Sequence, residues 1–410
     1  MDKLVSLLLF LLVFFIIVVS HEFGHFIVAK LNGVRVREFT VGMGPKLVGF
    51  RRNGTDYVLR ALPIGGACIY DTGLEDAFSK DDEAEKETSL KKKSLFESKV
   101  KEDDTSVTTA GASDDSKAAE GPKVTDGSKA GSDAGFLTEE TGIAYTEAPL
   151  FGRIAIVLAG PVFNFIMAYI LALVVVWNTG STNAKITSLM DGFPAKEAGL
   201  QVGDMITKMN GSNVHLASEI YVNTYTNKNR PMTIEYERNG EKHTVTVIPK
   251  YDEEVDRYLI GLNGYGEYVE CKDSSLFKYA FYEERYAFVG TWKSLGALLA
   301  GRGSKDDVAG PVGMAQAIDE VKDAAAPYGP WVVLLNMFNI AMLLSVNLGI
   351  LNLLPLPAID GGKLMFLFLE GVRGRPIPPE KEGIVHLVGF ALLAVLAVVV
   401  MYNDILRLIG

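Results

Sequence analysis

Cysteine is scarce in this chain of 410 residues, which contains only Cys68 and Cys271. Two cysteines provide neither a disulfide framework nor a cysteine-based metal site. Charged residues are also few, at 22%, whereas hydrophobic residues reach 48%. The chain is therefore too apolar for an ordinary soluble protein of mixed domains, and we expect a protein embedded in a membrane.

Long apolar runs supply the expected membrane segments. Each is about the length that crosses roughly 30 Å of hydrocarbon. The four runs are Leu4–Ala29, Arg153–Trp177, Trp331–Leu354 and His386–Tyr402. Lys3 before the first run resembles the basic end of a signal peptide, but His21 and Glu22 follow the run in place of a small-residue cleavage site. The sequence predicts a polytopic α-helical membrane protein with about four transmembrane helices, the first of them retained.

Lysine and arginine are concentrated in two connections between these helices, which marks the cytoplasmic side of a membrane protein. The first connection carries Lys30, Arg35, Arg37, Lys46, Arg51, Arg52 and Arg60, and the second carries Lys363, Arg373, Arg375 and Lys381. Four crossings then place residues 178–330 and both termini outside the cytoplasm. Cys68 and Cys271 lie on opposite sides in this topology and cannot pair.

Most of the formal net charge of −10 comes from one segment. Between Glu75 and Glu140 there are 18 acidic residues against 10 lysines, and Lys101–Ala134 contains no aromatic residue. Such a segment is too polar to bury a core, so we expect a disordered cytoplasmic insertion at 76–148. The rest of the chain is close to neutral, and nucleic acid is not an expected partner.

The first apolar run ends in the motif His21-Glu22-Phe23-Gly24-His25. Residues four apart lie on one face of a helix, so His21 and His25 can offer two imidazoles to one Zn²⁺ with Glu22 beside them. Such a short motif also arises by chance. Ionisable residues at membrane depth, however, cost about 2.5–3.5 kcal/mol each and usually mark a functional site. We therefore expect a zinc centre within the membrane.

A zinc hydrolase usually has three protein ligands, so the two histidines need a partner. His386 fits by residue type. Asp360 fits better by setting, because Pro355 and Pro357 interrupt the third span just before it, and irregular backbone at membrane depth is tolerated only inside protein or a wet cavity. Asp360 can instead cap a helix over Gly361–Val372. The residues alone leave both roles open.

Substrate contacts are expected near the same prolines. Asn352 and the backbone groups freed around Pro355 and Pro357 can hydrogen-bond a substrate backbone or a developing oxyanion. Helix packing is the competing role for Asn352. Packing is the favoured role for three residues of the second span, Gly160, Pro161 and Asn164.

Two further folded parts are predicted. Short alternating runs with glycine bends between Val34 and Tyr70 indicate a small β-sheet next to the motif helix. One edge of that sheet can align an extended peptide by strand addition, or the sheet can be a structural hairpin at the membrane surface.

The segment Asn183–Pro249 has the pattern of a compact α+β module. Its expected elements are strands at Lys185–Leu189 and around Met205, helices at Pro194–Leu200 and Leu216–Thr226, and a hairpin of Met232–Arg238 with His243–Ile248. The aromatic-rich segment Ser274–Leu299 is expected on the outer membrane surface.

These motifs together resemble the site-2 protease family of intramembrane zinc metalloproteases, specifically the bacterial regulator-of-sigma-E protease group. The resemblance rests on His21–His25, Val41–Pro45, Leu62–Gly66, Ala159–Asn164, Gly310–Gly313 and Asn352–Gly362. The segment Pro194–Gly211 resembles one bacterial PDZ domain. The resemblance covers essentially the whole chain except 76–148, where the insertion is unusual, and Ile359 stands where the family usually has leucine.

The resemblance implies an intramembrane zinc metalloendopeptidase with one extracytoplasmic PDZ domain and a membrane-associated β-sheet. The implied residues are the zinc ligands His21, His25 and Asp360, the catalytic Glu22, and the substrate-binding Asn352, Pro355 and Pro357. The implied substrates are single-span membrane proteins already trimmed outside the bacterial inner membrane, such as anti-sigma factors or leftover signal peptides. The PDZ domain, which binds a peptide or protein ligand, would exclude untrimmed ones, and the active site would face the cytoplasmic side.

Two other functions stay open from the sequence. One is a catalytically inactive, membrane-anchored PDZ adaptor, against which the intact Glu22 and the complete ligand set argue. The other is a metal transporter, which fits poorly with Glu22 and the PDZ pattern.

The expected organisation is a first transmembrane helix and sheet at 1–75, the insertion at 76–148, a second helix at 149–180, the PDZ domain at 181–250, an amphipathic segment at 251–330 and the last two transmembrane helices at 331–410.

Overall fold

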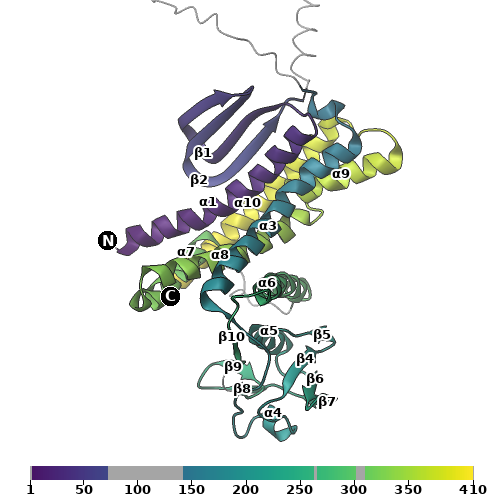
Figure 1. Ribbon diagram of the computed structural model, residues 1–410. Helices are drawn as coiled ribbons and strands as arrows, with labels where there is room; N and C mark the ends of the chain where they lie inside the picture. Colours follow the sequence, from purple (N-terminus) through teal and green to yellow (C-terminus); the bar gives the residue numbers. More distant parts are fainter. Residues whose placement is uncertain (1, 73–141, 263–265, 302–309, 410) are drawn as a thin grey trace, which may run out of the picture.

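The computed structural model describes residues 2–72, 142–262, 266–301 and 310–409. Within these residues, four helices are long and apolar enough to cross a membrane. They are α1 (Asp2–Leu31), α3 (Leu150–Thr179), α8 (Pro330–Leu353) and α10 (Pro379–Ile409) (Figure 1). The four predicted spans coincide with these helices, except that Leu354 lies one residue past the end of α8. The expected membrane helices are confirmed.

Helices α1, α3 and α8 form the packed centre of the bundle. Alanines with no exposed surface lie at their contacts, Ala168 and Ala172 on α3 and Ala341 on α8. Small residues let helix backbones approach closely, which is how helices associate in lipid. Helix α10 differs, because only 6% of its apolar window is buried, against 44% for α3 and for α8. It therefore touches the rest of the bundle at few points.

A β-sheet follows α1 directly. It is built from β1 (Val36–Arg52) and β2 (Thr55–Tyr70), joined by a turn in which Asn53 and Gly54 both have positive φ, as a tight hairpin requires. Both strands bend, so the first part of β1 pairs with two parts of β2: Val41, for example, pairs with Leu59 and with Gly66. The sheet packs on α1 through Phe26, whose ring lies 5.3 Å from that of Phe39.

The α+β module lies at the other end of the helices (Figure 1). Its four-stranded sheet has the order β5-β4-β6-β7, and helix α5 packs beside it. Its elements are β3 (Ser181–Thr182), α4 (Pro194–Glu197), β4 (Met205–Met209), β5 (Ser212–Asn213), α5 (Ala217–Asn227), β6 (Met232–Arg238), β7 (Glu241–Val247), β8 (Lys250–Asp252), β9 (Arg257–Leu259) and β10 (Tyr268–Val269).

The module follows the predicted order of elements, although α4 ends at Glu197 and not at Leu200, and β7 begins at Glu241 and not at His243. Two further differences concern its edges. The strand expected at Lys185–Leu189 is an extended segment held by isolated bridges, because its groups bond to loop residues such as Asp204 as well as to β4. The core also continues beyond residue 250, since Ile260 is buried in the same cluster as Ile206.

Two further helices connect the module to the bundle. Helix α6 (Ser275–Leu299) packs on α3, α8 and α5, and α7 (Pro311–Ala325) packs on α1 and α8. Arg285 of α6 forms an ion pair with the buried Glu219 of α5. The start of α7 is capped from α10, because the two carboxylate oxygens of Asp404 accept hydrogen bonds from the backbone N–H groups of Gly310 (3.2 Å) and Gly313 (2.8 Å).

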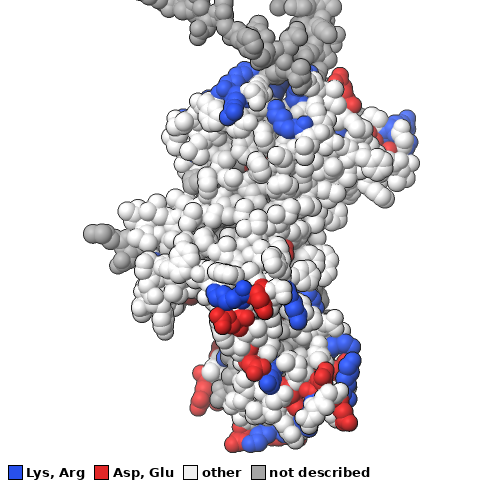
Figure 2. Space-filling view, viewed as in Figure 1, with Lys and Arg blue, Asp and Glu red and all other residues white. Residues whose placement is uncertain are grey.

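Figure 2 shows a broad, nearly uncharged band between two ends that carry charged side chains. The sheet and helix α9 (Asp360–Arg373) lie at one end and the module at the other.

Most of the predicted insertion at 76–148 lies outside the described residues. Its last residues, from 142, belong to the body: Ile143 bridges to Val34, and the Tyr145 ring stacks on Tyr70.

Candidate metal centre

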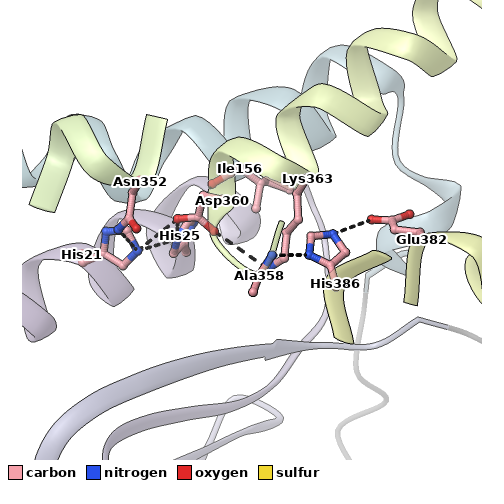
Figure 3. A network of polar contacts seen from close by, with 9 residues as sticks. All are labelled: His21, His25, Ile156, Asn352, Ala358, Asp360, Lys363, Glu382 and His386. Atoms are coloured by element: carbon pink, nitrogen blue, oxygen red, sulfur yellow. Dashed lines mark hydrogen bonds and ion pairs between the residues drawn. The ribbon is translucent and has the colours of Figure 1, made fainter. Parts of the chain in front are cut away.

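His21 and His25 lie one turn apart on α1, with ring centroids 4.7 Å apart. Asp360, the first residue of α9, completes the group (Figure 3). Its Oδ2 atom lies 3.1 Å from Nε2 of each histidine, and the two Nε2 atoms are 3.2 Å apart. Three potential ligand atoms from residues 21, 25 and 360 thus converge on one point.

These distances fit a tetrahedral zinc site. Ligand atoms about 2.0 Å from Zn²⁺ at tetrahedral angles are about 3.3 Å apart, close to the observed separations. The outer nitrogen of His25 is also fixed, because Nδ1–H donates to the carbonyl oxygen of Ile156 at 2.8 Å. In the neutral imidazole with its hydrogen on Nδ1, the lone pair of Nε2 is available to bind a metal. Among the described residues, this is the group of three such side chains close enough to hold one ion.

Two asparagines contact His21. Nδ2 of Asn164 lies 3.3 Å from its Nδ1, and Nδ2 of Asn352 lies 3.4 Å from its Nε2. The buried Oδ1 of Asn164 has no hydrogen-bond partner. Exchanging the oxygen and nitrogen of this amide would turn Oδ1 toward the Nδ1–H of a metal-binding His21.

The sequence favoured a packing role for Asn164, and the structure buries it in the bundle with its amide against His21 of the candidate centre. An amide within the apolar middle of α3, one turn from Gly160 and Pro161, was the available signal. Asn352, expected near the substrate, is buried beside His21. Of the two prolines predicted to contact the substrate, Pro355 is exposed and Pro357 is half-buried.

Close helix contacts bring the histidines to this point. A Cβ atom added to Gly160 on α3 would lie 2.4 Å from Nε2 of His25 and 2.6 Å from Cε1 of His21. A Cβ atom on Gly24 would lie 2.4 Å from the carbonyl oxygen of Ala159. Helices α1 and α3 can therefore cross at the site only because both positions are glycine. The sequence predicted a packing role for Gly160. In the structure, this packing lies at the candidate metal centre.

Asp360 reaches the histidines because α8 ends at Leu353 and the chain turns back before α9 begins. Gly361 and Gly362 let this turn close: added Cβ atoms would lie 1.8 Å from the carbonyl oxygen of Leu354 and 2.4 Å from that of Leu356. The residue in the N-cap position of α9 is Ile359, and the Asp360 carboxylate contacts the histidines. The helix-capping alternative for Asp360 is therefore wrong.

The second candidate for the third ligand, His386, does not join the group. Its Nδ1 accepts a hydrogen bond from the backbone N–H of Ala358 at 2.8 Å, and its Nε2 lies 3.7 Å from Oε1 of Glu382 (Figure 3). Neither nitrogen faces His21 or His25.

Glu22 lies beside the donors on the side of the sheet. It is half-buried, and β2 passes so close that a Cβ atom on Gly66 would lie 2.7 Å from Cγ of Glu22. Within the described residues, no group hydrogen-bonds to its carboxylate. Lys363 adds a positive charge, with Nζ 3.8 Å from Oδ1 of Asp360. A free carboxylate next to a metal centre is the arrangement that general acid–base hydrolysis needs.

Comparisons with known proteins agree with this chemistry. The sequence matches Peptidase family M50 over residues 9–396. It is 32% identical over 432 residues to the "Regulator of sigma-W protease RasP" of Bacillus subtilis and 34% identical over 436 residues to the "Zinc metalloprotease RasP" of Shouchella clausii. It is 32% identical over 438 residues to the "Probable protease eep" of Enterococcus faecalis. In all three cases the match covers 98% of this chain and 99% of the relative.

Among solved structures, the PDZ domain of the SdrC-like protein of Listeria monocytogenes matches with a TM-score of 0.18 and 20% identity, over 20% of this chain and 86% of that one. The family match spans nearly the whole sequence and includes both halves of the candidate centre. The chain therefore belongs to Peptidase family M50, the site-2 protease family, and is a zinc metalloprotease.

Proposed function

We propose that this protein hydrolyses peptide bonds in or near transmembrane segments, with His21, His25 and Asp360 as the zinc ligands. The observation that carries the proposal is the meeting of the three ligand atoms within 3.1–3.2 Å of one another, although the ligands come from two ends of the sequence. His21 and His25 lie on α1, one of the four helices apolar enough to cross a membrane, and Asp360 follows the end of another, α8, so the peptide bond to be cut belongs to a membrane-embedded chain.

Glu22 acts as the proton carrier. When bound, zinc polarises the scissile carbonyl and makes water more acidic. The Glu22 carboxylate, to which no group of the described residues hydrogen-bonds, takes the proton from the attacking water and delivers it to the nitrogen of the leaving amine. The Asn352 amide, 3.4 Å from Nε2 of His21, is near enough to hydrogen-bond the substrate backbone or the developing oxyanion.

The sheet holds the substrate extended. A helix hides its carbonyl groups in its own hydrogen bonds, so a membrane helix must unwind before it is cut. The stretch of β2 that ends at Tyr70 pairs with β1 on one side, and Gly66 in it touches Glu22. An unwound substrate added to the opposite side of this stretch would run past the catalytic carboxylate. Large apolar side chains such as Leu47 and Phe50 are exposed on the sheet, as expected of a surface in contact with lipid.

The substrates are single-span membrane proteins trimmed beforehand outside the membrane, of the anti-sigma factor or signal peptide remnant class. The α+β module, proposed to be an extracytoplasmic PDZ domain, lies at the opposite end of the bundle from the sheet, where it can exclude untrimmed proteins. The metal centre would then face the cytoplasmic side of a bacterial inner membrane. The B. subtilis relative is named a regulator of sigma-W protease, in line with this substrate class.

The test separates zinc binding from hydrolysis. Glu22→Gln should keep zinc but lose cleavage of a membrane substrate, by about 10²–10⁴-fold, whereas Asp360→Ala should lose both. Glu270→Gln, an exposed residue of the distant module end, is the matched control and should retain full activity. Membrane proteins that accumulate uncut with Glu22→Gln in cells identify the substrates. Intact cleavage by either site variant would refute the assignment.

A further inference from the structure

The turn that carries Asp360 contains a residue in an unusual backbone conformation. Ala358 has a φ of +75°, in the left-handed region that L residues rarely adopt. The other non-glycine residues with positive φ in the described chain are Asn53, Asn210, Lys228, Asn239 and Asp256. Most of these are asparagine or aspartate, whose side chains can stabilise this conformation. Alanine has no such group, so contacts from elsewhere must hold it.

The contact comes from α10. The backbone N–H of Ala358 donates to Nδ1 of His386 at 2.8 Å, and the preceding Pro357 packs directly against the same helix. A Cβ atom on Gly389 would lie 2.3 Å from Cβ of Pro357. Helix α10, although largely exposed, thus approaches closely at the two residues that precede Ile359 and Asp360.

The hydrogen bond also fixes the chemistry of His386. A backbone N–H can only donate, so Nδ1 of His386 is the acceptor and Nε2 carries the hydrogen. Nε2 points along α10 toward Glu382, 3.7 Å away, and not toward the metal centre. His386 is therefore a neutral imidazole whose one lone pair is used by the backbone of the Asp360 turn.

We propose that His386 is a positioning residue for the third zinc ligand. Its bond to Ala358 holds the left-handed turn, and the turn aims the Asp360 carboxylate at Nε2 of His21 and of His25. This inference rests on the proposed ligand role of Asp360. It also assigns a structural role to α10, because movement of this helix away from the turn removes the support of Asp360.

The experiment compares substitutions that remove or keep the acceptor. In His386→Ala the acceptor is lost, whereas in His386→Asn the amide oxygen occupies the place of Nδ1. Zinc affinity of the full chain in detergent is measured by competition with a chromophoric chelator, together with the absorption spectrum of the Co²⁺-loaded protein. Val388→Ala, exposed on the same helix, is the matched control.

We expect His386→Ala to bind zinc about 10–100-fold more weakly, the usual effect of losing a partner that orients a ligand. His386→Asn and Val388→Ala should stay within about threefold of the unmodified protein. Glycine adopts positive φ readily, so the loss caused by His386→Ala should shrink in an Ala358→Gly background, which also tests the proposal if His386→Ala folds poorly.

Three results would overturn the proposal: unchanged zinc affinity in His386→Ala, a loss in His386→Asn as large as in His386→Ala, or an undiminished loss in the Ala358→Gly background. A lower melting temperature with unchanged affinity would mean that His386 is merely structural. Asp360→Ala separates this inference from the proposed function. If that variant keeps zinc, the ligand set is wrong, and if it loses zinc while His386→Ala does not, only the positioning role fails.

Discussion

Gly160→Ala should empty the zinc site of a protein that still folds. The added Cβ atom would lie 2.4 Å from Nε2 of His25, whereas non-bonded heavy atoms are about 3.5 Å apart or more. Either the imidazole or helix α3 must therefore move by about 1 Å. Zinc sites keep their ligand distances within about 0.2 Å, so a displaced His25 can no longer bind together with His21 and Asp360.

We expect zinc affinity to fall by at least about a hundredfold, which is about 2.8 kcal/mol. The helix itself should gain, because alanine is favoured over glycine within a helix by about 1 kcal/mol. This gain offsets part of the cost of the clash, and circular dichroism separates loss of zinc from unfolding.

Zinc per chain, chelator competition and far-ultraviolet circular dichroism of the purified protein are the measurements. Gly383→Ala on α10 is the control, since nothing lies within 4 Å of its added Cβ atom. A Gly160→Ala protein with the original zinc affinity would refute the idea that the close crossing of α1 and α3 builds the site.

Three further predictions concern the parts around the centre. Arg285→Ala should weaken the contact of α6 with Glu219 by about 3 kcal/mol and speed limited proteolysis of the module; an unchanged rate contradicts this. Burial raises the pKa of Glu284 to about 7 from an ordinary 4.5, so the folded state binds this proton more tightly and its stabilising effect is lost as pH rises through 7. Glu284→Gln should therefore raise the melting temperature at pH 8 and not at pH 4.5, and equal shifts at both would be evidence against the raised pKa. Asp404→Ala should remove the cap on Gly310 and lower the free energy of unfolding by about 1–2 kcal/mol in denaturant titrations; no loss would mean that the cap adds nothing.

The sequence predicted the parts whose signal is local. An apolar run long enough to cross about 30 Å of hydrocarbon is a membrane helix almost regardless of its neighbours, and the four spans were found for that reason. The pairing of His21 with His25 was predictable from the motif, because helix periodicity alone puts both rings on one face. Asp360 was recognisable from the prolines before it and the glycines after it, which mark an interrupted helix.

The roles that the sequence missed depend on contacts across the chain. Asn164 touches His21 over 143 positions, and His386 supports Ala358 over 28. No periodicity encodes such pairs. His386 was a candidate ligand because histidine is a ligand by type, and only the fold shows that its lone pair serves a backbone N–H. The segment Lys185–Leu189 has the composition of a strand, but loop residues take part of its hydrogen bonding.

The separation of the proposed ligands along the chain also affects when the enzyme can become active. His25 and Asp360 are 335 positions apart. Translation proceeds from the N-terminus at about 5–20 residues per second, so Asp360 is added about 17 to 67 s after His25. During that interval the nascent chain carries two histidines in the membrane and no complete centre. The last of the three proposed ligands is synthesised only after the α+β module, so hydrolysis through this centre cannot begin before that module has been made.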